Sequence, residues 1–144
     1  MKPNNQIYQV CSEESFYRLW MTFLTPFHKL TPRERDVAAR IISQYFKLKN
    51  NVDDPEVLHD ILWSHKCRND MRESLKMSPA HFQMVLAKLR ENGVLEKGDK
   101  LNPKYIPHKT NEKIFNLSIV FDWRTEEEKR ADLERIRKER EAQQ

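Results

Sequence analysis

The chain has 144 residues, a net charge of +4, 33% charged residues and only two glycines. This length predicts one domain with room for a charged extension. Two glycines are too few for the glycine-rich phosphate loops of Rossmann and P-loop proteins. No apolar run is long enough to span a membrane, and no signal-peptide core follows the N-terminus. Cys11 and Cys67 lie far apart and outside any CxxC motif, so we expect free thiols and a cytoplasmic location.

Residues 1–29 are predicted to form an extended lead-in and an apolar helix. Ser12 is placed to cap this helix, and Pro26 is expected near its end. The apolar side chains recur at helical spacing: Phe16, Leu19, Trp20, Phe23, Leu24 and Phe27, with Tyr17 and Met21 beside them. A stripe this broad favours packing in the core. A dimerisation surface over residues 12–27 is the alternative.

Two more helices are predicted before the central motif. The sequence Thr31–Glu34 forms a capping box with a proline at the first helical position, and an apolar face follows it as far as Phe46. Asp54-Pro55 starts the next helix, which ends near Ser64. Residues 65–69 either continue that helix or begin another.

Residues 68–95 predict two short helices joined by a tight turn. Met71 and Leu75 lie one helical turn apart on the first of them. Ser78 is placed to cap the second, and Gly93 to end it with left-handed backbone. The second helix is expected to bury one stripe: Phe82, Val85, Leu86 and Leu89.

This stretch resembles the winged helix-turn-helix family, the MarR-like group in particular. The cap at Ser78, the four inward residues that follow it and Gly93 all match the family's pattern. Two positions depart from it, because Arg72 stands where an Ala is common and Lys76 stands where the turn often has Gly. The first departure implies looser helix packing. The second puts a residue with a Cβ where left-handed backbone is expected.

A two-stranded ribbon is predicted after the motif. Residues 95–105 would hold its first strand and a loop, residues 107–112 its tip, and residues 113–121 its second strand. Alternate residues of that second strand would share one apolar face: Phe115, Leu117, Ile119 and Phe121. The expected fold is therefore mostly α with a small β-ribbon, namely a winged helix-turn-helix domain over residues 30–123.

Residues 124–144 are predicted to form a charged C-terminal helix. Thr125 and Glu128 give it a second capping box. Its apolar residues are too sparse for a coiled coil, so we expect it to be exposed or to lie between partners.

The family resemblance implies binding of double-stranded DNA, with the second helix of the motif in the major groove and the wing on the backbone. Gln83 would contact adenine, and Lys88 and Arg90 would contact phosphates or guanine. Ser78 and the helix N-terminus would hold a phosphate. The other candidate contacts are His81 on the outward face, Arg68, Arg72 and Lys76 on or beside the supporting helix, and Lys109 and Lys113 on the wing.

Nothing in the sequence predicts catalysis. No Ser or Cys has a recognisable nucleophile context, so we expect no catalytic residues, no cofactor and no small-molecule substrate. His59, His65 and Cys67 lack the paired spacing of a zinc site, and we expect no metal.

The charge distribution leaves a second function open. Residues 1–50 hold eight basic and four acidic side chains, whereas residues 51–93, which contain the motif, hold six and seven. DNA-binding surfaces normally concentrate basic residues. The alternative is a non-enzymatic module whose winged helix contacts protein.

The overall pattern is also similar to small winged-helix proteins of tailed bacteriophages. The shared features are a leading apolar helix, the Leu30-Thr31 helix start, and the sequence Leu101-Asn102-Pro103 before the last strand. The resemblance implies either a transcriptional or replication DNA binder in the host cytoplasm or a virion or packaging component. A homodimer or phage assembly partners would then be contacted through residues 12–27 and 124–144.

Overall fold

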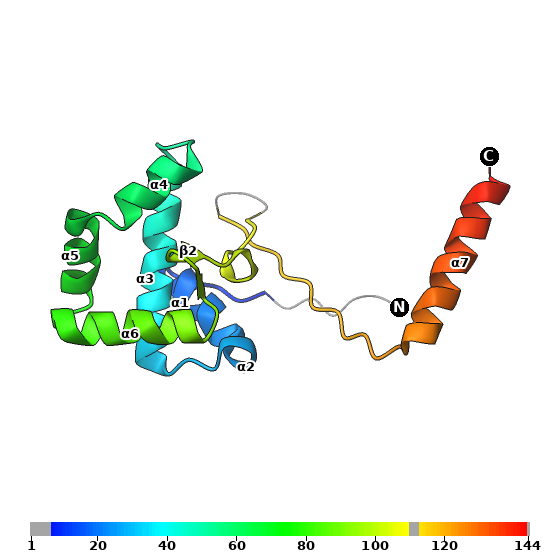
Figure 1. The fold of residues 1–144 in the computed structure, drawn as a ribbon, viewed down its shortest axis with the longest axis horizontal. Helices are drawn as coiled ribbons and strands as arrows, with labels where there is room; N and C mark the ends of the chain where they lie inside the picture. The colour runs from blue at the N-terminus through cyan, green and yellow to red at the C-terminus, as the bar shows by residue number, and fades with distance from the viewer. Residues whose placement is uncertain (1–6, 110–112, 144) are drawn as a thin grey trace. The chain divides into compact units, whose positions relative to one another are not determined.

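A computed structural model describes residues 7–109 and 113–143. The chain divides into two units, Met1–His108 and Lys109–Gln144. The described residues are mostly helical, with a small antiparallel sheet (Figure 1). The elements are α1 (Glu13–Phe23), α2 (Thr25–His28), α3 (Pro32–Lys49), α4 (Pro55–Leu62), α5 (His65–Ser74), α6 (Pro79–Glu91), β1 (Leu95–Glu96), β2 (Lys100–Leu101), the 3-10 turn η1 (Pro103–Tyr105) and α7 (Glu126–Ala142).

The helices begin where short polar side chains can accept a backbone hydrogen bond. Thr31 and Thr125 each form the complete predicted capping box with a glutamate three residues later. Single side-chain caps begin four more helices: Ser12 at α1, Asp54 at α4, Ser64 at α5 and Ser78 at α6, whereas α2 has no side-chain cap. The cap at Ser64 settles the ambiguous stretch, because residues 65–69 belong to a separate helix.

Helix α1 starts as predicted but is shorter than expected. It ends at Phe23, and Pro26 lies inside the separate helix α2 because proline is tolerated in a first helical turn. The buried face is centred on Tyr17, Trp20 and Met21, which lie against α3. Phe23 and Phe27 of the predicted stripe are exposed. Tyr17, Trp20 and Met21 of the surface suggested for dimerisation are therefore core, and the remaining residues of the stripe are half-buried or exposed.

The core of the first unit is built around α3. Val37, Ile41 and Ile42 of this helix are each 0% exposed, and they lie among side chains of the surrounding helices. Complete burial of one such side chain contributes about 1.5–3 kcal/mol. Leu86 and Leu89 complete this core from α6, which fixes the orientation of that helix.

The predicted ribbon is wrong in its second strand. β1 pairs with β2 immediately after a short turn, with Leu95 opposite Leu101. Gly98 and Asp99 adopt left-handed backbone at φ values of 78° and 60°, and the Asp99 amide donates to the Glu96 carbonyl at 3.0 Å. This local closure satisfies β1, so no distant strand is required. Residues 113–121 form neither strand nor helix, and residues 110–112 of the expected tip lie outside the described residues.

Side-chain hydrogen bonds attach this hairpin region to the helices. The Trp63 indole donates to the Asp99 carbonyl at 2.9 Å, and the Trp20 indole donates to the Tyr105 carbonyl at 2.8 Å. Asn102 donates to the Gly93 carbonyl at 2.8 Å. The segment that follows α6 is thus held to α1 and α4.

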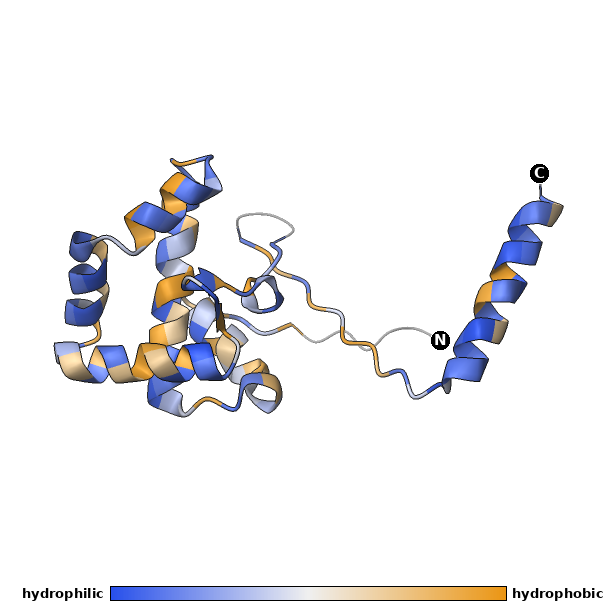
Figure 2. Cartoon of the chain, viewed as in Figure 1, coloured by the Kyte–Doolittle hydropathy of each residue, from blue (hydrophilic) through white to orange (hydrophobic). Residues whose placement is uncertain are grey.

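The second unit is an extended segment followed by α7, which begins at its predicted cap. Helix α7 buries no residue, and its surface is largely hydrophilic (Figure 2). The segment before it exposes large apolar side chains: Ile114, Leu117, Ile119, Val120, Phe121 and Trp123. None of the helices in the described part of the chain has the length and apolar character needed to cross a membrane.

Candidate nucleic-acid interface

Helices α5 and α6, joined by a tight turn, carry most of the candidate residues. Helix α6 buries the predicted stripe, with Phe82 at 2% and Leu86 and Leu89 at 0% exposure. Gln83 and Lys88 are exposed, and no other part of the described chain covers them. The outward orientation expected for these two residues is therefore confirmed.

Gln83 and Lys88 nevertheless lie on different flanks of α6. Five residues advance an α-helix by about 140° beyond one full turn. The Gln83 flank adjoins α5, since Gln83 lines a pocket with residues of that helix. On the other flank, the Lys88 ammonium forms an ion pair with Glu91 at 3.1 Å.

The turn between the two helices has the strained backbone that the sequence suggested. Lys76 has a φ of 53°, a left-handed value that a residue with a Cβ rarely adopts. Its amide donates to the Glu73 carbonyl at 3.0 Å, and the Met77 amide donates to the Arg72 carbonyl at 3.2 Å. The Arg72 side chain also donates to the Met77 carbonyl at 3.0 Å, so this candidate residue helps to hold the turn.

Ser78 and His81 lie together at the start of α6. The Ser78 hydroxyl accepts a hydrogen bond from the His81 amide at 3.2 Å, and both side chains are exposed. The Ser78 hydroxyl therefore serves as the helix cap.

Arg90 binds another residue of the same unit. Its guanidinium donates to both carboxylate oxygens of Asp99, at 2.5 and 3.2 Å. These hydrogen bonds from Arg90 lower the pKa of Asp99, with a further contribution from the positive charge of Arg68. The geometry makes Arg90 a clamp between α6 and the hairpin.

The basic residues near the hairpin turn differ from those predicted. Lys109 and Lys113, expected on the wing, belong to the second unit. Lys97 and Lys100 flank Gly98 and Asp99 instead, and both are exposed. The dipeptide Gly98-Asp99 was the sequence signal for this turn.

A pocket of about 190 Å³ lies between α5 and α6. Its polar lining comes mainly from one face of α5, because residues spaced by three and four positions share a helix face. The lining includes His65, Arg68, Asn69 and Arg72 from α5, and Phe82 and Gln83 from α6. Arg68 and Arg72, both expected on or beside the supporting helix, thus line the same pocket.

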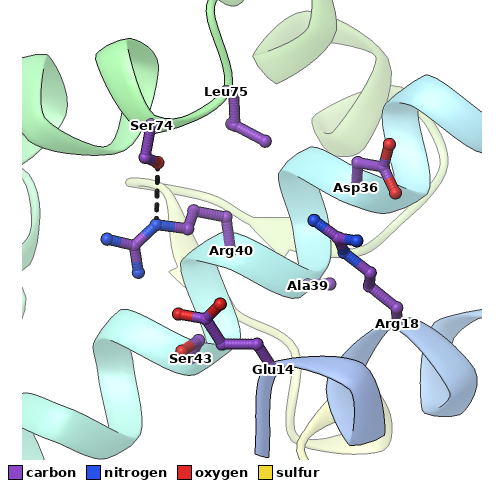
Figure 3. Close-up of a pocket in the computed structure, with 8 residues that line it drawn as sticks. All are labelled: Glu14, Arg18, Asp36, Ala39, Arg40, Ser43, Ser74 and Leu75. Atoms are coloured by element: carbon purple, nitrogen blue, oxygen red, sulfur yellow. Dashed lines mark hydrogen bonds between the residues drawn. The ribbon is translucent and has the colours of Figure 1, made fainter. Parts of the chain in front are cut away.

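A second pocket, of about 120 Å³, lies where α1, α3 and the end of α5 meet (Figure 3). Glu14, Arg18, Asp36 and Arg40 contribute opposite charges to its lining. Arg40 donates to the Ser74 hydroxyl at 2.9 Å and so connects α3 with α5. The balanced charges favour a structural polar cluster over an anion site.

No group of three or more His, Cys, Asp or Glu side chains within the described residues is arranged to hold a metal ion. The chain matches no protein-family model, no curated protein and no solved structure. The functional interpretation therefore depends on the geometry of α5, α6 and the hairpin.

Proposed function

We propose that the first unit is a winged helix-turn-helix module that binds double-stranded DNA. Helices α5 and α6 form the helix-turn-helix, and the β1–β2 hairpin is a short wing. The observation that carries the proposal is the exposed side of α6 at Gln83, which lies beside Arg68 and Arg72 of α5. An exposed polar helix flanked by arginines suits a major groove bordered by phosphates.

The wing contact is assigned to Lys97 and Lys100. Both ammonium groups are exposed, and neither forms an ion pair among the residues that the structure describes. They adjoin Asp99, whose carboxylate is already bound by Arg90. Positive charge at the hairpin turn suits contact with the DNA backbone.

Duplex binding measured by fluorescence anisotropy from 50 to 300 mM salt tests the proposal. We expect the logarithm of the association constant to fall linearly with the logarithm of salt concentration. Gln83→Ala should lower affinity for the preferred duplex more than for a random one, because base contacts carry specificity. Absence of binding at 50 mM salt would exclude this function.

A second candidate function, contact with protein in a phage assembly, is favoured by the extended segment before α7. Ile119 is 57% exposed and Phe121 is 81% exposed, and exposed apolar segments mark contact sites for protein. Ile119→Asp should abolish co-sedimentation with an assembly partner without changing affinity for a duplex. Loss of both properties would not fit separate surfaces.

A further inference from the structure

The pocket between α5 and α6 has a lining of one charge sign. Arg68 and Arg72 lie one turn apart on α5, and no carboxylate lines the pocket. Asp70 and Glu73 of the same helix lie outside the lining, because they fall between the positions that share the pocket face. The volume of about 190 Å³ far exceeds the roughly 10–15 Å³ that one water needs by this measure, so an oxyanion has room to enter.

Neither arginine is neutralised by an ion pair in the described part of the chain. The nearby carboxylate of Asp99 accepts two hydrogen bonds from Arg90 and is therefore already compensated. The positive charge of Arg68 nevertheless contributes to the lowered pKa of Asp99. The lining of the pocket itself therefore holds two guanidinium groups and no carboxylate.

Arg68 also has an unsatisfied donor. Its Nε is buried from solvent and has no hydrogen-bond acceptor among the described residues. A buried donor without an acceptor costs about 1–3 kcal/mol. The Arg68 guanidinium lies over the Trp63 ring, 5.5 Å from its centroid, which restricts its orientation.

The Arg72 side chain is restrained and still has N–H donors available. One of its terminal nitrogens donates to the Met77 carbonyl at 3.0 Å, and a guanidinium has five N–H donors. Two restrained guanidinium groups beside one pocket match the several acceptor oxygens of a phosphate, which arginine binds in a bidentate manner.

We propose that Arg68 and Arg72 bind a phosphodiester group of the DNA backbone in this pocket. The inference rests on the proposed function and adds the anchoring point of the duplex. It puts the backbone contact on the Gln83 flank of α6, so that Gln83 faces the groove beside the anchored strand. Lys88, on the other flank, contacts the duplex separately.

The first experiment measures duplex binding by two single variants of the full chain, Arg68→Gln and Arg72→Gln. Loss of one phosphate contact reduces by about 0.9 the magnitude of the slope of the logarithm of the association constant against the logarithm of salt concentration. Lowering the salt from 1 M to 0.1 M then strengthens duplex binding about eightfold less than it does for the wild type. Lys66→Gln is the matched control, because Lys66 is an exposed cation of α5 that does not line the pocket. We expect it to change the slope less than either arginine variant.

The second experiment separates the pocket from the duplex. Titration of the wild-type chain with inorganic phosphate, against chloride at equal ionic strength, is followed by the nitrogen NMR signal of Arg68 Nε. Saturable shifts with phosphate and none with chloride are expected. If Arg68→Gln fails to fold, Arg72→Gln and this titration still decide the outcome.

The two experiments together distinguish a wrong pocket assignment from a wrong proposed function. If both arginine variants keep the wild-type slope while Lys88→Glu weakens duplex binding, the pocket assignment is wrong and the proposed function stands. If phosphate shifts Arg68 but the wild-type chain binds no duplex, or binds only a phosphopeptide, both the DNA-backbone assignment and the proposed function are wrong. Absence of any Arg68 shift together with unchanged slopes also overturns the inference.

Discussion

The guanidinium of Arg90 and the carboxylate of Asp99 form a two-point hydrogen-bonded pair between α6 and the hairpin turn. The pair joins two residues that would otherwise be free to move apart, since the strands hold only two residues each. Asp99 also has left-handed backbone, and its carbonyl accepts the Trp63 indole. One residue of the turn therefore joins the hairpin to two helices.

Asp99→Asn tests this clamp through pH. Hydrogen bonds from Arg90 hold the pKa of Asp99 below its usual value of 3.8, so the ionised form stabilises the fold. The stabilisation is complete above about pH 5 and is lost as the pH falls through the lowered pKa. Asn tolerates left-handed backbone, which makes this variant a control for conformation. In urea unfolding, the wild type should be more stable than Asp99→Asn by about 1 kcal/mol or less from pH 5 to 8. The two proteins should converge in stability as the pH falls below 3.8.

Lys88→Glu should weaken duplex binding by at least tenfold at 0.1 M salt and leave the melting temperature nearly unchanged. The Lys88 side chain is exposed on α6 and pairs only with Glu91 among the described residues. Reversal of its charge would place two carboxylates near the phosphates. Lys47→Glu on α3 makes the same change in net charge away from α6 and should have a smaller effect. Equal affinity of Lys88→Glu and wild type would remove Lys88 from the interface.

Phe82→Ala should lower the free energy of unfolding by about 3–5 kcal/mol, because it leaves a cavity at a ring that is 2% exposed. Met84→Ala, two residues away on the same helix, removes a side chain that is 69% exposed. Its effect should stay within about 0.5 kcal/mol. Chemical denaturation of both variants measures the difference, and a loss below about 1 kcal/mol for Phe82→Ala would contradict the packing of α6.

Lys76→Gly should stabilise the protein by about 0.5–1 kcal/mol. A left-handed conformation costs a residue with a Cβ about 1–2 kcal/mol, and only part of this is offset by the greater flexibility of Gly in the unfolded chain. Lys76→Ala removes the same charge but keeps the Cβ, so it should bring no such gain. A thermal denaturation series of the three proteins tests the turn, and equal gains from Gly and Ala would attribute the effect to charge.

His28 predicts a loss of stability in mild acid. It is 1% exposed; its Nδ1 accepts from the Leu30 amide at 3.0 Å, which leaves Nε2–H to donate to the Met21 carbonyl at 2.7 Å. Burial lowers the pKa of this imidazole from 6.5, against the hydrogen bond to Met21. Below about pH 6.5 the imidazole of His28 is protonated in the unfolded chain but stays neutral in the folded chain. The free energy of unfolding therefore falls as the pH drops, by at most about 1.4 kcal/mol per pH unit.

Urea midpoints at pH 7.5 and 5.5 measure this effect of His28. His28→Asn keeps the other four histidines, and its stability should change less between the two pH values than that of the wild type. If both proteins lose the same stability on acidification, the dependence comes from other groups.

The sequence predicted the helices well because their signals are local. Ser12, Thr31, Ser78 and Thr125 each act on amides within three residues, and this chemistry operates without knowledge of the rest of the fold. The buried stripe of α6 was predictable for a related reason, since helical periodicity alone defines one apolar face.

The β1–β2 hairpin and the Arg90–Asp99 pair depend on three-dimensional contacts that the sequence pattern does not reveal. Alternating apolar residues over 113–121 predicted a strand, but a strand also needs a partner, and β1 is already paired through the turn at Gly98. Arg90 was expected to contact DNA because charge alone does not reveal that Asp99 lies within hydrogen-bond distance. The pocket at Arg68 depends likewise on how closely α5 approaches α6.

The hydrogen bond from the Trp20 indole to the Tyr105 carbonyl joins residues separated by 85 positions. At a synthesis rate of about 5–20 residues per second, the ribosome makes the acceptor roughly 4–17 seconds after the donor. During that interval the Trp20 indole lacks the acceptor that it has in the folded protein. Completion of the first unit on the ribosome must therefore wait for the segment that follows the hairpin.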